Sequence, residues 1–288
     1  MGLTHLLHPT DFSDSATHAL RQAVRLALAH QAKLHVFHAM LLHAEDPAQE
    51  QPRLDAYAEV AAREAREWAA GSIRPEASLD YEVSVGRAVS AHDAIMEKIG
   101  QLKPELLVLG THGRSGLSKF LMGSDAEKLL RHAPCDVLSL RADARLGGTD
   151  GSFRRVLVPV DFSEPSRRAL ETAKAHASET DSLITLLHAV EPIPPMYLAG
   201  GLTSRFQLDS DLPARVSSKL EEWGHGGADQ VLVTEGPTAS EIIRIADEIR
   251  ADLVVMGSHG LSGLEHVLVG SVTEKVCRFA RTPVLVVK

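Results

Sequence analysis

The chain carries the same sequence pattern twice, with a period of about 150 residues. Residues 6–13 read LLHPTDFS, and residues 156–163 read VLVPVDFS. Near the end of each half, GTHGRSGLSKFLMGS at 110–124 corresponds to GSHGLSGLEHVLVGS at 257–271. Solenoid proteins have repeats of roughly 20–50 residues, so this longer period indicates two copies of a whole domain.

The length of the chain agrees with two domains. Its 288 residues are too many for one ordinary core, and they suit two domains of roughly 140 residues each. We place the first domain at 1–142, a linker at 143–153 and the second domain at 154–288. The linker is rich in Gly, Asp and small residues, and this composition predicts an exposed connection.

Within each half, short apolar runs alternate with segments of helical periodicity. Strands are expected at 3–8, 33–40, 79–84, 105–110 and 136–141, and again at 155–160, 182–190, 230–235, 252–257 and 283–287. The runs LLVLG and LVVMG do not alternate with polar residues, which is typical of strands buried on both faces. The alternation of strand and helix predicts an α/β fold, with a doubly wound, Rossmann-like parallel sheet in each copy.

The last strand of each half, at 136–141 and 283–287, would lie exposed at the edge of its own sheet. Pairing these two strands with each other would hide both edges. We therefore expect the two domains to face each other about a pseudo-twofold axis, as an intramolecular pseudo-dimer.

The halves differ most at 192–211, where three prolines and two glycines replace helix-forming sequence. This segment predicts a loop before a shorter helix that starts near residue 210.

A glycine pattern follows the fourth expected strand of each half. In the second half it is Gly257-x-x-Gly260, then nine residues, then Gly270. The first half repeats the spacing with Gly110, Gly113 and Gly123. Glycine lets the backbone turn sharply and approach a ligand closely, so each pattern predicts a loop that contacts a ligand.

The glycine loop of the second half ends where a helix is expected to start, at residues 270–273. The free N–H groups and the positive dipole end of a helix N-terminus favour an anion such as phosphate. The hydroxyls of Ser271 and Thr273 would add donors. The chain contains no G-x-x-x-x-G-K-[ST] and no G-x-G-x-x-G sequence, which excludes a P-loop NTPase and argues against a standard dinucleotide-binding fold.

Composition excludes several other classes of protein. The net charge is −8 and aromatic residues make up 4% of the chain, so we expect no nucleic-acid partner. No stretch approaches about 20 consecutive apolar residues, and the start MGLTHLLHPTDFS has no basic region of a signal peptide. We therefore expect no membrane contact and a cytoplasmic location. The two cysteines form no C-x-x-C pair, and we expect both to be reduced.

The ordered set of motifs resembles the universal stress protein family. The G-x-x-G, nine-residue gap, G-[ST] pattern after a buried strand resembles the nucleotide loop of that family. It occurs twice, each time about 100 residues after a strand that ends in HPTD or VPVD. The final residues GSVTEKVCRFARTPVLVVK are also similar to the way the family's sequences end. The resemblance covers the chain except 142–153 and 191–210, and it implies an ATP-binding regulator of the stress response.

The resemblance implies roles for individual residues of the second half. Asp161 would contact the ribose hydroxyls or help to order the site, and Ala189 would meet adenine through its backbone. The ribose and the phosphates would be held by Gly257, Gly260, Gly270, Ser271 and Thr273, with Val272 as part of the same site. The corresponding residues of the first half are Asp11, Ala39, Gly110, Gly113, Gly123 and Ser124.

The first half departs from this pattern at the start of its helix. Asp125 and Ala126 stand where the second half has Val272 and Thr273. A carboxylate beside a triphosphate costs energy, because like charges repel in a partly dry site. Alanine also lacks the hydroxyl of threonine. We therefore expect weaker or absent ATP binding in the first half, although Arg114 could partly offset the negative charge.

Simpler structural roles remain open for some of these residues. Asp11 and Asp161 precede helices whose N-caps we expect at Ser13 and Ser163, so the aspartates could serve only to order the helix starts. The glycines could be ordinary turn residues.

Histidines recur at matching positions in the two halves. His112 and His259 lie inside the glycine loops, without an H-x-x-x-H or Cys/His cluster in either loop. We therefore expect loop-stabilising hydrogen bonds there, with a phosphate contact as the main alternative, and no metal site. His38 and His188 lie on the second expected strand of each half and are expected to be hydrogen-bonded core residues.

The family resemblance implies a binder of adenine nucleotide, with ATP, alone or with Mg²⁺, as its ligand. Unknown regulatory proteins would be its partners, and two copies could form a homodimer. A slow ATPase or phosphotransferase is the chief alternative; no lysine, arginine finger or positioned base is evident for fast phosphoryl transfer. A nucleotide-free scaffold is the third hypothesis.

Overall fold

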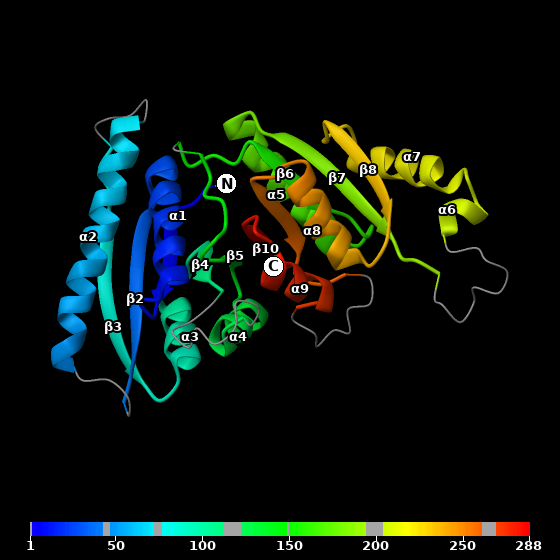
Figure 1. Ribbon diagram of the computed structural model, residues 1–288. Helices are drawn as coiled ribbons and strands as arrows, with labels where there is room; N and C mark the ends of the chain where they lie inside the picture. Colours follow the sequence, from blue (N-terminus) through cyan, green and yellow to red (C-terminus); the bar gives the residue numbers. More distant parts are fainter. Residues whose placement is uncertain are drawn as a thin grey trace.

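The fold is seen in a computed structural model, which describes residues 2–42, 47–71, 77–111, 122–148, 150–193, 204–260 and 269–288. Within these ranges, ten strands form one continuous sheet with helices packed on both faces (Figure 1). The strands are β1 (His5–Thr10), β2 (Lys33–Leu41), β3 (Tyr81–Ala88), β4 (Leu106–Gly110), β5 (Asp136–Leu140), β6 (Arg155–Pro159), β7 (Leu183–Val190), β8 (Gln230–Glu235), β9 (Leu253–Gly257) and β10 (Val284–Val287). The helices are α1 (Asp14–His30), α2 (Pro47–Gly71), α3 (Ala91–Leu102), α4 (Ser124–His132), α5 (Glu164–Thr180), α6 (Arg205–Leu208), α7 (Leu212–Gly224), α8 (Thr238–Glu248) and α9 (Ser271–Phe279).

All ten expected strands are present. β1 begins two residues later than expected, because its pairing with β2 starts at His5, opposite Lys33. The strand order is β3-β2-β1-β4-β5-β10-β9-β6-β7-β8. Neighbouring strands are parallel except for β5 and β10, which are antiparallel. The order of each half repeats on either side of this central pair, which confirms the prediction of two doubly wound sheets joined as a pseudo-dimer.

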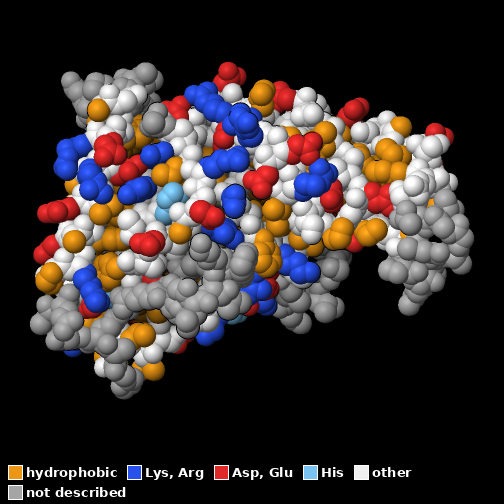
Figure 2. Space-filling view, in the orientation of Figure 1, with side chains coloured by type: hydrophobic (Ala, Val, Ile, Leu, Met, Phe, Trp, Pro, Cys, Tyr) orange, Lys and Arg blue, Asp and Glu red, His pale blue; other side chains and the backbone are white. Residues whose placement is uncertain are grey.

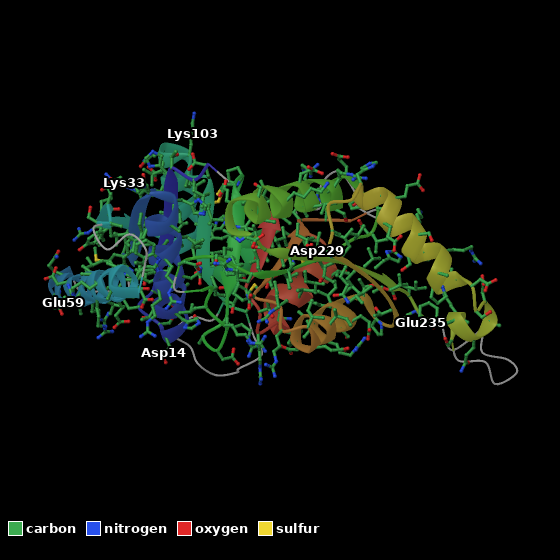
Figure 3. The ribbon with its side chains drawn as sticks, turned by 90° about the horizontal axis from the view of Figure 1, so that it is seen from above. Asp14, Lys33, Glu59, Lys103, Asp229 and Glu235 are labelled. Atoms are coloured by element: carbon green, nitrogen blue, oxygen red, sulfur yellow. The ribbon has the colours of Figure 1, made fainter. Side chains whose placement is uncertain are left out.

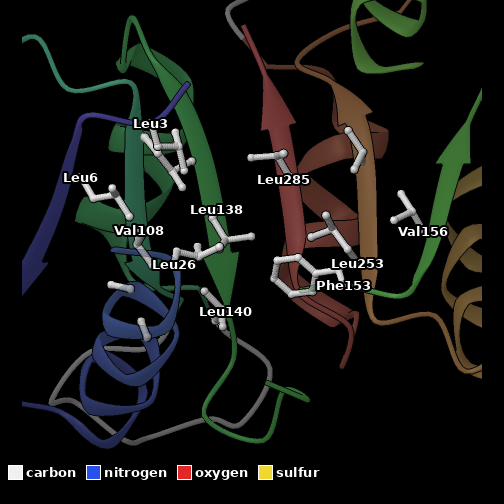
Figure 4. Close-up of a cluster of buried hydrophobic side chains, with 14 of the residues drawn as sticks. Leu3, Leu6, Leu26, Val108, Leu138, Leu140, Phe153, Val156, Leu253 and Leu285 are labelled. Carbon is white, nitrogen blue, oxygen red and sulfur yellow. The ribbon is translucent and has the colours of Figure 1, made fainter. Parts of the chain in front are cut away.

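The junction between the halves is a continuous part of the core. Leu138 of β5 lies opposite Leu285 of β10 in the antiparallel pair, and both side chains are buried. Figure 4 shows these two leucines in a cluster of apolar side chains contributed by both halves. The pairing therefore removes two strand edges from solvent and also buries apolar side chains across the junction.

The linker is less exposed than its composition predicts. Phe153 is buried in the core, and Gly147 is buried against α1. The N–H of Gly147 donates to Gln22 Oε1 at 2.8 Å, and the Gly147 carbonyl accepts from Arg25 Nη1 at 2.8 Å. The expectation of an exposed connection is therefore wrong for these residues, because backbone polar groups of the linker find side-chain partners on α1. Asp143 remains exposed.

The helix that follows the first strand of each half starts as expected. Ser13 and Ser163 are the N-caps of α1 and α5, and their hydroxyl oxygens accept from the N–H groups of Ala16 and Ser166.

The helices form two layers, one on each face of the sheet. α1, α2, α5 and α7 pack on one face, and α3, α4, α8 and α9 pack on the other. On the face seen in Figure 2, positive and negative side chains are interspersed over both halves.

The second half contains shorter helices where the first half has α2. The 25-residue α2 is replaced by the 13-residue α7, which starts at Leu212. This confirms the prediction of a shorter helix starting near residue 210. The four-residue α6 was not expected, and 194–203 lie outside the described residues. No helix within the described ranges is both long enough and apolar enough to cross a membrane.

Candidate functional site

A cavity of about 500 Å³ opens at the carboxyl ends of the strands in the second half. β6 has β9 on one side and β7 on the other, and such a reversal of strand order is where open α/β sheets bind ligands. The ends of β6, β7 and β9, the starts of α8 and α9, and α6 line the cavity. All eight residues predicted for the main site lie in its wall: Asp161, Ala189, Gly257, Gly260, Gly270, Ser271, Val272 and Thr273.

The first half has a smaller cavity, of about 310 Å³, at the corresponding place. Five of its six predicted residues line it: Asp11, Ala39, Gly110, Gly123 and Ser124. The sixth, Gly113, lies outside the described residues, as do His112 and Arg114. Asp125 and Ala126 also line this cavity, so the extra carboxylate is a feature of the cavity wall.

The N-terminus of α9 is open towards the second-half cavity. Gly270 is its N-cap residue, and within the described residues no side chain caps the helix. The N–H groups of Ser271 to Thr273 belong to the first turn, which has no intrahelical partners for them. They provide donors at the positive end of the helix dipole, as an anion site requires.

Two of the donors expected at this site are already used by the protein. The N–H of Gly270 donates to the Ser258 carbonyl at 2.7 Å. The hydroxyl of Thr273 donates to the Gly257 carbonyl at 3.0 Å and is buried. The expectation that the Thr273 hydroxyl donates to a ligand therefore differs from the structure, in which this hydroxyl ties the start of α9 to the end of β9.

The space available for a side chain differs among the three glycines of the second half. A Cβ on Gly257 would lie 2.6 Å from Cβ of Pro165. The absence of a side chain at Gly257 therefore allows α5 to pack on β9, and it does not serve the approach of a ligand. A Cβ on Gly260 would collide with Oδ2 of Asp161. A Cβ on Gly270 would lie 3.5 Å from the nearest protein atom, so the protein itself leaves space at that position.

Asp161 has two different carboxylate oxygens. Oδ1 accepts from the N–H of Ser163 at 3.0 Å and from the hydroxyls of Ser163 and Ser166. The role in ordering the helix start is therefore correct for this oxygen. Oδ2 faces Gly260 at the cavity. Between Asp161 and Ser163, Phe162 has φ +66°, an unfavourable backbone conformation for a bulky residue.

The backbone of Ala189 faces the space beyond the end of β6. The N–H of Val160 donates to the Leu187 carbonyl at 2.8 Å, and the N–H of Gly236 donates to the Val190 carbonyl at 3.0 Å. Alternate residues of a strand direct their backbone groups to the same side. Ala189, two residues after Leu187, therefore directs its N–H and C=O to the β6 side, where β6 has ended.

The histidines make the hydrogen bonds expected of them. His188 Nδ1 lies 2.7 Å from the Val160 carbonyl, and His38 Nδ1 lies 2.8 Å from the Thr10 carbonyl. His259 Nδ1 lies 3.0 Å from the Ser258 hydroxyl, within the glycine loop. Among the described residues, no group of three or more His, Cys, Asp or Glu side chains is arranged to hold a metal ion.

Besides His188, which was expected in the core, four polar residues of the cavity wall were not predicted: Ser166, Glu191, Arg205 and Thr238. The Thr238 hydroxyl donates to Glu191 Oε1. Arg205 starts α6, in the segment that has no equivalent in the first half. The repeat could not reveal these residues, and the divergence of 192–211 was the only signal near two of them.

Comparisons with known proteins agree with the fold and the repeat. A profile of the Universal stress protein family matches residues 2–141 and again 152–288. A universal stress protein of Mycobacterium tuberculosis is 32% identical over 186 residues, which are 64% of this chain and 62% of that relative. A universal stress protein of Methanocaldococcus jannaschii is 35% identical over 142 residues, which are 47% of this chain and 82% of that relative.

A solved structure supports the same architecture over the full length of the chain. The universal stress protein from Archaeoglobus fulgidus has a TM-score of 0.65 and 24% identity, and the match covers 99% of this chain and 98% of that one. The match to the mycobacterial relative spans less than two thirds of that protein's length, whereas the two family matches together cover nearly all of this chain. The chain therefore belongs to the universal stress protein family.

Proposed function

We propose that the second half binds an adenine nucleotide, with ATP as the principal ligand, and that nucleotide occupancy regulates a stress response through conformation or partner binding. The observation that carries the proposal is the meeting of an uncapped helix N-terminus and an open strand edge in one cavity of about 500 Å³. Cofactor cavities usually have volumes of about 300–1,000 Å³.

The base would bind at the end of β7. Ala189 offers one donor and one acceptor side by side, which suits the amino group and the ring nitrogen on one edge of adenine. Leu187, Ile242 and Met256 line the same cavity and provide apolar surface for the faces of the ring.

The phosphates would bind at the start of α9, where the N–H groups of residues 271–273 and the hydroxyl of Ser271 provide donors. This chemistry needs no lysine. Mg²⁺ would be held mainly by the phosphates and water, as is usual for this ion, and Asp161 is a carboxylate of the same cavity wall.

The first half would bind nucleotide more weakly. Its cavity is smaller, and Asp125 places a carboxylate in the first turn of α4.

A slow ATPase or phosphotransferase remains the second candidate. Turnover near or above about 1 s⁻¹ would favour it, since typical enzymes work at about 1–10³ s⁻¹.

The proposal is tested with Gly270→Asp. The structure has space for a side chain at Gly270, and its φ of −75° suits any residue, so the variant should fold. Its carboxylate would lie at the phosphate end of the cavity, and we expect ATP affinity to fall about 100-fold or more. Isothermal titration calorimetry measures the affinity, and ATP should raise the melting temperature of the wild type but not of the variant.

Gly123→Asp is the matched control, because Gly123 is the N-cap of α4 with φ −62°. This variant should bind ATP nearly as the wild type does. The reverse ranking of the two variants would place the main site in the first half. A wild type that carries no nucleotide after purification and shows no thermal shift with ATP would support the nucleotide-free scaffold instead.

A further inference from the structure

Arg205 brings a positive charge to the wall of the second-half cavity. Its side chain is exposed, and no ion pair to its guanidinium is found in the part of the chain that the structure describes. It begins α6, and α6 and α7 occupy the place that α2 has in the first half. The guanidinium is therefore available to a ligand of the second half.

α6 is fixed to the sheet by Glu235, the last residue of β8. The Glu235 carboxylate accepts from the N–H of Arg205 at 2.6 Å, from the N–H of Phe206 at 3.3 Å and from the hydroxyl of Ser204. Figure 3 shows Glu235 beside α6. Loss of water opposes ionisation of Glu235, but these hydrogen bonds and the positive charge of Arg205 together outweigh it and lower the pKa of the carboxyl. The anchor is thus charged at neutral pH, and it holds Arg205 at the cavity.

The strand order shows which end of the cavity Arg205 occupies. Glu235 is paired with Val190 of β7, so α6 is anchored next to the strand end that contains Ala189. The N-terminus of α9 follows β9, and β7 and β6 lie between β8 and β9. Neighbouring strands are about 4.8 Å apart, which separates the ends of β8 and β9 by roughly 14 Å. Arg205 therefore lies at the end opposite the anion site.

We propose that Arg205 binds the base of the nucleotide, with its guanidinium stacked on the exposed face of the ring, and that Glu235 positions it. This inference rests on the proposed nucleotide function and adds a base-recognition residue to it. A guanidinium is planar and weakly hydrated, so it stacks on an aromatic ring better than an ammonium does. α6 then covers the base, while the amides of α9 bind the phosphates.

The experiment compares Arg205→Ala and Arg205→Lys with the full-length wild type, using ATP, adenosine and inorganic tripolyphosphate as separate probes. We expect Arg205→Ala to weaken ATP and adenosine by a similar factor, about tenfold, with tripolyphosphate unchanged. Arg205→Lys should also bind ATP and adenosine more weakly, because lysine keeps the positive charge but lacks the planar guanidinium group that stacks on the base. Arg215→Ala is the control. Arg215 is also exposed, pairs with Asp209 at 2.6 Å and does not line the cavity.

Other results overturn the inference in distinct ways. A loss confined to ATP and tripolyphosphate, restored by Arg205→Lys, would mean that Arg205 binds phosphate and not the base. Equal affinities of wild type and Arg205→Ala for adenosine would show that the base does not need Arg205, while the proposed nucleotide site would stand. A wild type that binds neither ATP nor adenosine would remove both proposals.

Discussion

One buried polar residue of the first half has an apolar counterpart in the second half. His8 in β1 corresponds to Val158 in β6. It is fully buried, with Nδ1 2.9 Å from the Val108 carbonyl and Nε2 2.9 Å from the Tyr57 hydroxyl. Burial lowers the pKa of His8 to about 4, although the hydrogen bond to Val108 and the charge of Asp11 act in the opposite direction.

This pKa predicts a loss of stability in acid. The unfolded chain takes up a proton at His8 as the pH falls below about 6.5, whereas the folded chain does so only near pH 4. The free energy of unfolding should therefore fall by about 3 kcal/mol over this window through His8 alone. Urea unfolding of wild type and His8→Val between pH 7 and pH 4 measures the effect. The difference between the two proteins should change in favour of the variant as the pH falls; a difference independent of pH would contradict the prediction.

The sequence predicted which residues meet at the site better than it predicted what each one does. The glycine spacing after an expected strand predicted that Gly257 and Gly270 belong to one site, and the family resemblance added Asp161; the carboxyl ends of parallel strands lie at the same edge of a sheet. The sequence could not predict that Gly257 makes room for Pro165, or that the Thr273 hydroxyl is used by the Gly257 carbonyl. Those contacts join residues distant in sequence, and no local pattern records them.

At the scale of elements, the starts of α4 and α9 are the clearest difference between the halves. Both follow a glycine N-cap whose N–H donates to a backbone carbonyl, Gly123 to Thr111 and Gly270 to Ser258. Only α9 has a threonine, Thr273, whose hydroxyl bonds to the end of the preceding strand. The described residues on either side of the two glycine loops are therefore hydrogen-bonded in the same way, and the first turn of the following helix distinguishes the halves.

The double change Asp125→Val with Ala126→Thr gives α4 the start of α9. The new threonine can donate to the Gly110 carbonyl as Thr273 does to Gly257, and the repelling carboxylate is removed. We expect the first half to gain ATP binding by about 100-fold, which calorimetry would detect as a second binding event. The reciprocal change, Val272→Asp with Thr273→Ala, should weaken the second half. An unchanged stoichiometry in the first variant would show that other features disable the first cavity.

Regular elements were predictable because their own sequences specify them. The ten strands are short apolar runs between helical segments, and all ten were found within a few residues of their expected positions. α6 is only four residues long and is held by Glu235, about 30 residues further along the chain. Its position depends on that long-range contact, so its own sequence gives little signal. Arg205 was missed for the same reason.

At the scale of the whole molecule, the two cavities lie on one continuous sheet, and the two halves also meet between α4 and α9. Besides the β5–β10 pair, Arg131 of α4 contacts Glu127 of its own helix at 3.0 Å and Glu274 of α9 at 2.5 Å. Glu274 lies in the first turn of α9, beside the proposed phosphate site. One guanidinium of the first half thus contacts the helix that would bind phosphate in the second half.

A continuous sheet predicts that the halves unfold together, and the junction can be weakened to test this. Leu138→Ala removes buried side-chain volume from β5, at the contact with Leu285 of β10, and should cost about 2–5 kcal/mol. Leu170→Ala makes the same chemical change on α5, within the second half, and should cost a similar amount. If the junction makes unfolding cooperative, Leu138→Ala should split the calorimetric transition into two, whereas Leu170→Ala should only move it to lower temperature. Two separate transitions already in the wild type, and in both variants, would mean that each half unfolds by itself, and that pairing β5 with β10 hides strand edges without linking the stability of the halves.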